Sequence, residues 1–288
     1  MFTFAYYYEK RSITQLRTIM EIDQAAASNI QEYLFKIRGR GRYAFTLDEL
    51  RSKFSISENA INQSLFRLKS KGQIAQVRQG FFVVIPPEYA SSGILPLYFF
   101  IDQMMKWLGK PYYIGLLSAA ALHGSSHQQP MESFIITRPP ALRKISTGKI
   151  AINFLLKNSW DDSDIIQKKT EAGYINVSSP ELTALDLLLF NNWMVINRAT
   201  AVISELADEM KPSVLLQTAR RFPVTAAIQR LGYLLDIELG NEKLASAVEK
   251  ALADRKIHPV PLSISKERKG EISPRWKVII NMEVESDI

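Results

Sequence analysis

A segment between residues 58 and 71 carries side chains that could read DNA bases. Projected at about 100° per residue, Ile61, Leu65 and Leu68 form one narrow apolar stripe, which predicts an amphipathic helix. Asn, Gln and Arg offer paired donors and acceptors that match base edges in the major groove, whereas Lys and Ser suit phosphates. The opposite side of this helix carries both kinds: Asn59, Asn62, Gln63, Phe66, Arg67 and Ser70, with Lys69 and Lys71 at its flanks. Phe66 is unusual on a solvated face and suits a thymine methyl group or a partner chain. We predict a DNA-reading helix; the alternative is an ordinary amphipathic surface helix.

The residues on both sides of this helix favour a winged helix-turn-helix. Thr46 followed by Glu49 has the spacing of a capping box and predicts a helix over residues 46–54. After a short break, Ser57 can cap the second helix, and Gly72 suits the left-handed position past its end. Two apolar strands are expected at residues 74–77 and 81–85, with Arg78 and Gln79 in the connection between them. A helix, a tight turn, a second helix and a basic hairpin together form a DNA-binding unit.

Positive charge is concentrated in the same part of the chain. Residues 36–88 hold ten lysines and arginines against four acids, a net charge of +6, while the whole chain carries +7. Such a local excess suits a segment that displaces counterions from a phosphate backbone. Arg40 and Arg42 belong to its densest run, for which a solvated helix end is the alternative interpretation. The candidate DNA-binding residues are therefore Ser57, Asn59, Asn62, Gln63, Arg67, Lys69, Lys71, Arg78, Gln79, Arg40 and Arg42.

The rest of the chain offers no convincing catalytic pattern. His123 and His127 have the spacing of a zinc-binding helix, but Gly124 stands where that motif requires Glu. The adjacent Gly-Ser pair resembles the opening of a nucleotidyltransferase site, yet the strand expected at residues 134–137 lacks the carboxylates that hold its metal ions. The acidic pair at residues 161–162 is interpreted as a solvated turn. The sequence thus predicts no catalytic residue, no metal site and no cofactor, and a protein that is not an enzyme.

Composition narrows the class of protein further. The chain has 288 residues, 47% of them hydrophobic, which is enough for two domains with sizeable cores. It contains no Cys, which excludes disulfides and thiolate zinc sites. No apolar run approaches the roughly 20 residues that span a bilayer, and the aromatic N-terminus lacks the basic start of a signal peptide. We expect a cytoplasmic protein without membrane contact, in which residues 1–27 are an N-terminal extension.

Turn-forming residues at 86–93 predict a domain boundary after residue 89. The winged helix-turn-helix would occupy residues 28–89, beginning with a helix, and a larger domain residues 90–288. In this larger domain the hydrophobic patterns predict two early helices, several strands and then a helical second half. The expected helices are 97–108, 113–123, 180–190, 198–210, 212–220, 224–239 and 241–255, and the expected strands are 134–137, 149–157, 173–177 and 276–281. The fold class is therefore α+β.

Several local patterns along the chain are similar to those of one known family. They lie at residues 60–72, 77–83, 86–89, 112–130, 179–187, 197–207 and 229–235. Together they cover roughly residues 28–255, and the stretch at residues 112–130 is fairly specific. On these patterns the chain resembles the AbiEi antitoxins of abortive-infection, type IV toxin–antitoxin systems.

The resemblance implies a bifunctional protein. Family members bind inverted repeats in their own promoter through the winged helix and repress the operon. Their second domain counters a partner toxin that resembles nucleotidyltransferases, which need not involve a stable complex of the two proteins. The resemblance assigns no residue to neutralisation. From the residues alone an alternative stays open: a one-component winged-helix transcription factor whose second domain senses a small molecule.

Overall fold

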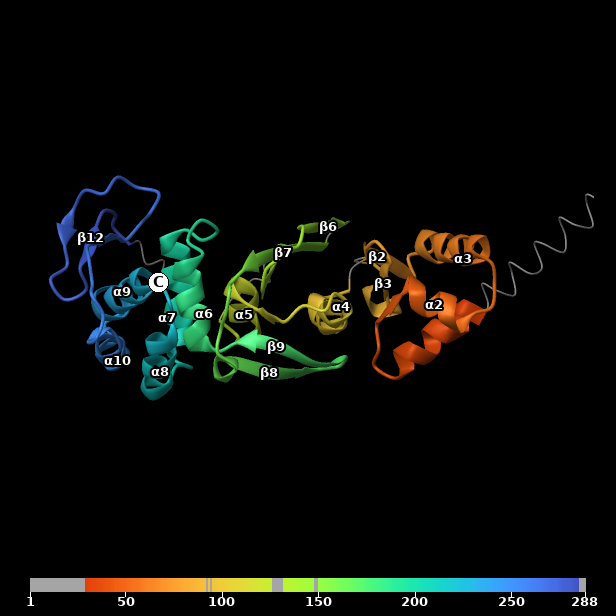
Figure 1. Cartoon of the computed structure of the whole chain (residues 1–288), viewed down its shortest axis with the longest axis horizontal. Helices are drawn as coiled ribbons and strands as arrows, with labels where there is room; N and C mark the ends of the chain where they lie inside the picture. The colour runs from red at the N-terminus through yellow and green to blue at the C-terminus, as the bar shows by residue number, and fades with distance from the viewer. Residues whose placement is uncertain (1–28, 92, 94, 126–131, 148–149, 285–288) are drawn as a thin grey trace, which may run out of the picture. The chain divides into compact units, whose positions relative to one another are not determined.

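The computed structural model describes residues 29–284, apart from residues 92, 94, 126–131 and 148–149 (Figure 1). Contacts divide the chain into two compact units. The first extends to Gly109 and includes Ile145–Ile150 and Lys169–Tyr174; the second holds Lys110–Lys144, Ala151–Lys168 and the chain from Ile175 onward. This division by contacts falls after Gly109. The predicted boundary after residue 89 concerns the functional domains and stays a prediction.

The first unit contains both helices and the hairpin that the sequence predicts. After a helix at residues 29–39 come β1 (Ala44–Thr46), α2 (Leu47–Lys53), α3 (Glu58–Ser70), β2 (Ile74–Arg78) and β3 (Phe81–Val84). The strands form an antiparallel sheet in the order β1-β3-β2, in which the short strand β1 had not been predicted. Thr46 caps α2 by accepting from the Glu49 N–H at 3.1 Å, and Ser57 caps α3 by accepting from the Ala60 N–H at 3.2 Å. Gly72 has a φ of +66° just past the end of α3. The predicted caps and the predicted helix stop are confirmed.

The core of the first unit contains the apolar stripe of α3. Ile61, Leu65 and Leu68 are buried, as predicted, against residues from the other elements of the unit. Their buried neighbours are Ile30, Tyr33, Leu34, Ile37, Phe45, Leu50, Ile74, Phe82 and Val84. Because this stripe is buried, the opposite side of α3 faces solvent.

The chain after the hairpin also packs within the first unit. It forms the short 3₁₀ turns η1 (Pro87–Tyr89) and η2 (Leu97–Phe99) and the helix α4 (Ile101–Trp107). The Phe99 ring lies 4.7 Å from the Tyr43 ring, and the Trp107 ring lies 5.4 Å from the Phe81 ring of β3. The short strand β6 (Ile145–Thr147), which contacts assign to this unit, lies beside β2. The predicted helix at residues 97–108 is thus divided between η2 and α4.

A mixed six-stranded sheet with strand order β6-β7-β5-β4-β9-β8 lies mostly in the second unit. Besides β6, its strands are β4 (Tyr112–Ile114), β5 (Ser133–Thr137), β7 (Ile150–Leu156), β8 (Ile165–Thr170) and β9 (Gly173–Ser178). Strand β4 pairs antiparallel with β5 and parallel with β9, while β5 pairs parallel with β7. The predicted strands β5, β7 and β9 are confirmed, and β8 had not been predicted.

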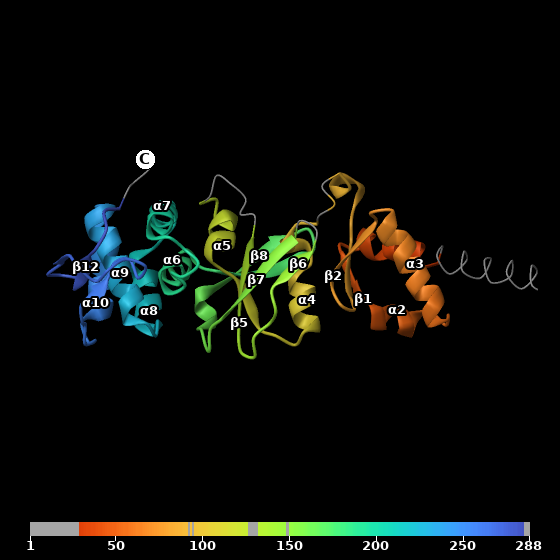
Figure 2. The ribbon, with the colours of Figure 1, turned by 90° about the horizontal axis from the view of Figure 1, so that it is seen from above.

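Within the sheet segment, α5 (Leu116–Leu122) follows β4, and the 3₁₀ turn η3 (Asp162–Asp164) precedes β8. Helices follow the last strand of the sheet, as predicted: α6 (Pro180–Leu189), α7 (Ile196–Ala207), α8 (Pro212–Arg221), α9 (Thr225–Tyr233) and α10 (Glu242–Leu252), with the π-helical turn η4 (Leu234–Glu238) between α9 and α10. Helices α6 to α10 gather beyond one end of the sheet in both views (Figures 1 and 2). The tail adds β10 (Val260–Pro261), β11 (Glu271–Ile272) and β12 (Val278–Ile280), in the order β10-β12-β11.

One sequence-based prediction in this unit is wrong. The helix expected from about Tyr113 to His123 starts only at Leu116, because Tyr112–Ile114 forms the central strand β4. A short segment of apolar residues shows no hydrophobic period, so its sequence cannot distinguish a buried strand from a buried helix. In the fold, hydrogen-bonded pairing with a strand on each side makes this segment a strand. The class α+β is confirmed, and among the described residues no helix is long and apolar enough to cross a membrane.

Candidate functional site

The solvent-facing side of α3 is the candidate site of the first unit. Asn62, Gln63 and Arg67 are exposed, and in the described part of the chain their side chains have no hydrogen-bond or ion-pair partner. Their donors and acceptors are therefore available to another molecule. The same exposed surface holds Ser57, Asn59, Phe66, Lys69, Ser70 and Lys71. We call this surface, from Ser57 to Lys71, the α3 face.

An ion-pair cluster holds the start of α3 against α2. Arg51, near the end of α2, donates through Nε to Glu58 Oε2 at 3.0 Å and through Nη1 to Asp48 Oδ1 at 2.9 Å. Glu58 is the first residue of α3, so this guanidinium joins the two helices across the turn. Its carboxylate partners also lie in the first turns of their helices, where negative charge is favoured. The turn between α2 and α3 sets the direction of the α3 face. It is thus supported by these side-chain contacts as well as by the buried core.

The remaining predicted DNA-binding residues lie in different environments. Arg40 and Gln79 are exposed, and Arg78 is half-buried. Arg42 donates through Nη2 to Glu49 and through Nε to the Ala44 carbonyl at 3.1 Å. Its guanidinium therefore joins the loop before β1 to helix α2, and this contact had not been predicted.

Glu49 is the centre of that contact. Its two carboxylate oxygens accept from the Tyr33 hydroxyl and from Arg42 Nη2. Burial raises the pKa of the Glu49 carboxyl, but the hydrogen bonds from Arg42 and Tyr33 together outweigh burial and leave the pKa below its usual 4.5. Burial, followed by the Glu49 contact, raises the pKa of Tyr33 to about 12. Glu49 therefore stabilises the unit in its ionised form.

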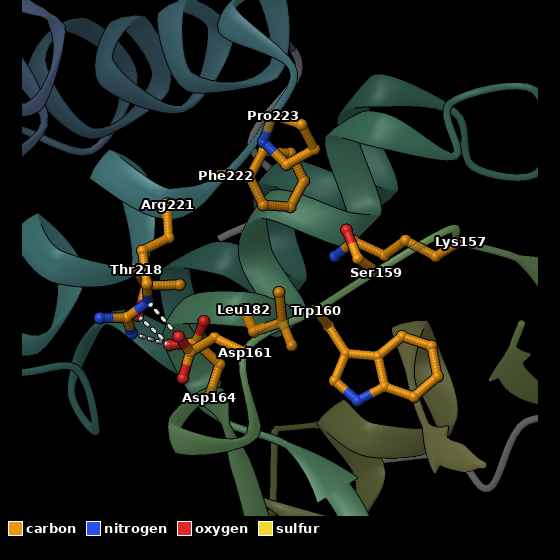
Figure 3. Close-up of a pocket in the computed structure, with 10 residues that line it drawn as sticks. All are labelled: Lys157, Ser159, Trp160, Asp161, Asp164, Leu182, Thr218, Arg221, Phe222 and Pro223. Carbon is orange, nitrogen blue, oxygen red and sulfur yellow. Dashed lines mark hydrogen bonds and ion pairs between the residues drawn. The ribbon is translucent and has the colours of Figure 1, made fainter.

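The second unit contains a cavity of about 240 Å³ between the end of β7 and helix α8 (Figure 3). It is lined by Lys157, Ser159, Trp160, Asp161, Asp164, Leu182, Thr218, Arg221, Phe222 and Pro223. The walls combine apolar rings with charged side chains, and two of these charged side chains, Lys157 and Asp164, are almost fully buried. Asp186, which lies behind Lys157 and does not line the cavity, is also buried. A buried charge requires a partner of opposite charge or a hydrogen bond. What this cavity can bind therefore depends on whether its charged side chains are already paired within the protein.

Lys157 is fully engaged within the protein. Its Nζ donates to Asp186 Oδ1 at 2.8 Å and to the Tyr113 hydroxyl at 3.4 Å, and it lies 4.5 Å from the centre of the Phe222 ring. Tyr113 in turn donates to Asp186 Oδ2 at 2.7 Å. Burial raises the pKa of both the Asp186 carboxyl and the Tyr113 hydroxyl. These three side chains join β7, α6 and β4 at the centre of the unit.

Arg221 is engaged in the same way on the other side of the cavity. Its Nη2 lies 2.7 Å from Asp164 Oδ1, which also accepts from the Thr218 hydroxyl at 2.7 Å, and its Nε lies 3.5 Å from Asp161 Oδ2. Figure 3 shows the guanidinium directed at both carboxylates. Because both cations of the cavity are paired with acids, it is not a ready-made anion site.

The histidine pattern of the sequence does not become a metal site among the described residues. His123 Nε2 lies 2.8 Å from the Ser178 carbonyl, and burial lowers its pKa. His127 lies outside the described residues. No group of three His, Asp or Glu side chains in the described part of the chain is arranged to hold a metal ion. The histidine that can be described is engaged with the backbone of β9.

Residues 113–237 match the family model for the C-terminal domain of AbiEi antitoxins. This segment belongs to the AbiEi antitoxin family. The AbiEi segment begins in strand β4, includes the whole cavity and ends in η4. The resemblance predicted from the sequence is therefore confirmed, and the match supports a role as the antitoxin of a toxin–antitoxin system. AbiEi antitoxins are not a family of enzymes.

The fold is similar to that of a solved structure over most of both chains. The RV2827C protein from Mycobacterium tuberculosis gives a TM-score of 0.64 at 16% sequence identity, covering 88% of this chain and 91% of that chain. At this identity the likeness concerns the fold alone. The chain matches no protein of curated function.

Lys157 and Asp186 of the AbiEi segment provide a first test. We expect Lys157→Met to lower the free energy of unfolding by about 3–5 kcal/mol, because it leaves the Asp186 charge buried without its cation. In the double variant Lys157→Met, Asp186→Asn the uncompensated charge is gone, and the Asn side chain can still accept from Tyr113. Urea unfolding of the full chain should therefore show partial recovery in the double variant. A double variant no more stable than Lys157→Met would contradict this account of the cluster.

Glu49 predicts a pH dependence of the first unit. Because its folded pKa lies below 4.5, its stabilising contribution is present above pH 4.5 and is lost as the pH falls through the folded pKa. We expect Glu49→Gln to cost about 1 kcal/mol near neutral pH, with the cost shrinking only in acid. Urea unfolding of both proteins at a series of pH values measures the difference. In a protein that already carries Arg42→Gln, Glu49→Gln should lower the free energy of unfolding by less. An equal loss with and without Arg42 would show that the ion pair is not the source of the stabilisation by Glu49.

Proposed function

We propose that this protein is a bifunctional antitoxin of a type IV toxin–antitoxin system. The AbiEi domain neutralises a partner toxin that resembles nucleotidyltransferases, and the first unit acts as a winged helix-turn-helix that represses the protein's own operon. The match of residues 113–237 to the AbiEi antitoxin domain carries the first part of the proposal. The proposal assigns no catalytic residue to this chain, and neutralisation does not require a stable complex.

The α3 face carries the second part. Helices α2 and α3 are joined by a short capped turn and followed by the hairpin β2–β3, which is the order of elements in a winged helix-turn-helix. In such a unit the second helix enters the major groove. Asn62, Gln63 and Arg67 would then read base edges with hydrogen-bonding groups that have no partner among the described residues.

The other exposed residues would position the protein on the DNA. Asn59, which is exposed near the start of α3, is the exception, because its amide would read a base edge as Asn62 and Gln63 do. Ser57 lies at the start of α3, where backbone N–H groups also favour phosphate. Lys69, Lys71 and Arg40 would contact phosphates, together with Arg78 and Gln79 of the wing. Arg42 has a different role in the proposal, because its guanidinium is engaged with Glu49 and Ala44. It supports the geometry of the unit. Inverted repeats in the promoter are the proposed target, as the resemblance to AbiEi antitoxins implies.

A second candidate function is a one-component transcription factor that senses a small molecule. The cavity of about 240 Å³ in the second unit favours it. The internal pairing of Lys157 and Arg221 argues against it, because a polar ligand would have to displace an acid from one of them. A ligand that changes operator affinity would support this candidate.

The experiment that tests the proposal is a growth rescue. The gene next to this one is expressed alone, and then together with the full chain. Growth arrest by the neighbour and recovery with the full chain support the antitoxin role. A neighbour without toxicity, or arrest that the full chain does not relieve, would reject it and promote the ligand-sensing regulator.

The division of roles on the α3 face predicts different effects of two substitutions. We expect Arg67→Ala to cost about 1–3 kcal/mol of binding to the operator and to relax sequence preference, because a base contact is lost. Lys69→Ala should weaken binding to operator and random DNA alike and reduce the salt dependence, because a phosphate contact is lost. Titrations of both DNAs at two salt concentrations measure this. Equal losses on the two DNAs for both variants would refute the assignment.

A further inference from the structure

Phe66 is the one apolar residue on the polar α3 face. Its side chain is 71% exposed, although large aromatic side chains ordinarily gain stability from burial. In the described part of the chain its ring has no aromatic or cationic partner. The exposed Phe35 differs, because the Arg38 guanidinium lies 5.3 Å from the centre of its ring. The protein itself thus leaves the Phe66 ring uncovered.

The position of Phe66 on α3 places it among the groups that would read bases. Residues three and four apart share one side of a helix, so Phe66 lies beside Asn62 and Gln63, and Arg67 follows it directly. Its ring cannot take part in hydrogen-bonded readout. The major groove offers one prominent apolar group, the C5 methyl of thymine.

We propose that Phe66 recognises a thymine methyl group and so makes the α3 face specific for an A·T pair at one position in each half-site. This inference rests on the proposed DNA binding and adds the chemistry of one contact to it. Adenine presents N6 and N7 in the groove beside the methyl group of its paired thymine. Asn62 or Gln63 can accept and donate to the adenine while the ring of Phe66 covers the methyl group.

The experiment removes the methyl group and leaves the rest of the base intact. The binding site is first located by footprinting of the full chain on the DNA upstream of its gene. Each thymine of one half-site is then replaced singly by deoxyuridine, and affinity is measured by titration. We expect one position at which the wild-type chain loses about fourfold in affinity, the effect of one methyl-sized apolar contact.

Two variants connect that position to the ring. Phe66→Ala should lose affinity for the thymine operator and show no further loss on the deoxyuridine operator. Phe35→Ala is the matched control, since it removes an exposed phenylalanine outside the α3 face. It should bind as the wild type does and keep the deoxyuridine effect.

The possible failures are distinguishable. A wild-type chain that protects operator DNA but responds to no deoxyuridine overturns the methyl contact alone. A Phe66→Ala variant that keeps the deoxyuridine effect does the same. If this variant binds the operator normally but changes from dimer to monomer in light scattering, the ring covers a second copy of the chain and the inference is wrong. If the wild-type chain protects no DNA, the DNA-binding part of the proposed function fails together with the inference.

Discussion

Burial of Ile61, Leu65 and Leu68 decides which side of α3 faces solvent. These three side chains are almost fully buried in the core of the first unit, so a rotation of α3 about its axis would expose them. The polar groups of Asn62, Gln63 and Arg67 therefore face outward as a consequence of core packing. The Ser57 cap marks where α3 begins, and Arg51 pairs with Glu58 across the turn from α2. The proposed DNA-reading surface depends on this packing more than on any single polar residue.

A different constraint organises the AbiEi domain. Asp186 lies in a helix in which almost every residue is buried, and its charge is balanced by Lys157, which directly follows strand β7. A buried ion pair contributes little net stability, but it is costly to break, so it favours one arrangement of strand and helix over others. The nearby pairing of Arg221 with Asp164 acts in the same way. The cavity between these clusters is lined by charges that the protein already satisfies. The proposal therefore assigns neutralisation to the AbiEi segment but not to the cavity.

Local signals in the sequence predicted most elements but few of the long-range contacts. The caps Thr46 and Ser57, the stop at Gly72 and the helical period of α3 act over a few residues, and the structure confirms them. Strand β4 could not be recognised, because its strand character comes from pairing with β5 and β9. The partners of Arg42 and Lys157 were missed for the same reason. Asp186 within an apolar helix was the one available hint, since a charge in such a run must be buried and paired.

The central claim is that two activities lie on separable surfaces of one chain. The most direct test measures both in the same cells, as growth in the presence of the neighbouring gene product and as expression from the chain's own promoter. The variant combines Asn62→Ala, Gln63→Ala and Arg67→Ala in the full chain, at an abundance matched to the wild type. The account predicts that this variant restores growth as the wild type does but no longer represses the promoter. Loss of both activities, or retention of both, would contradict it.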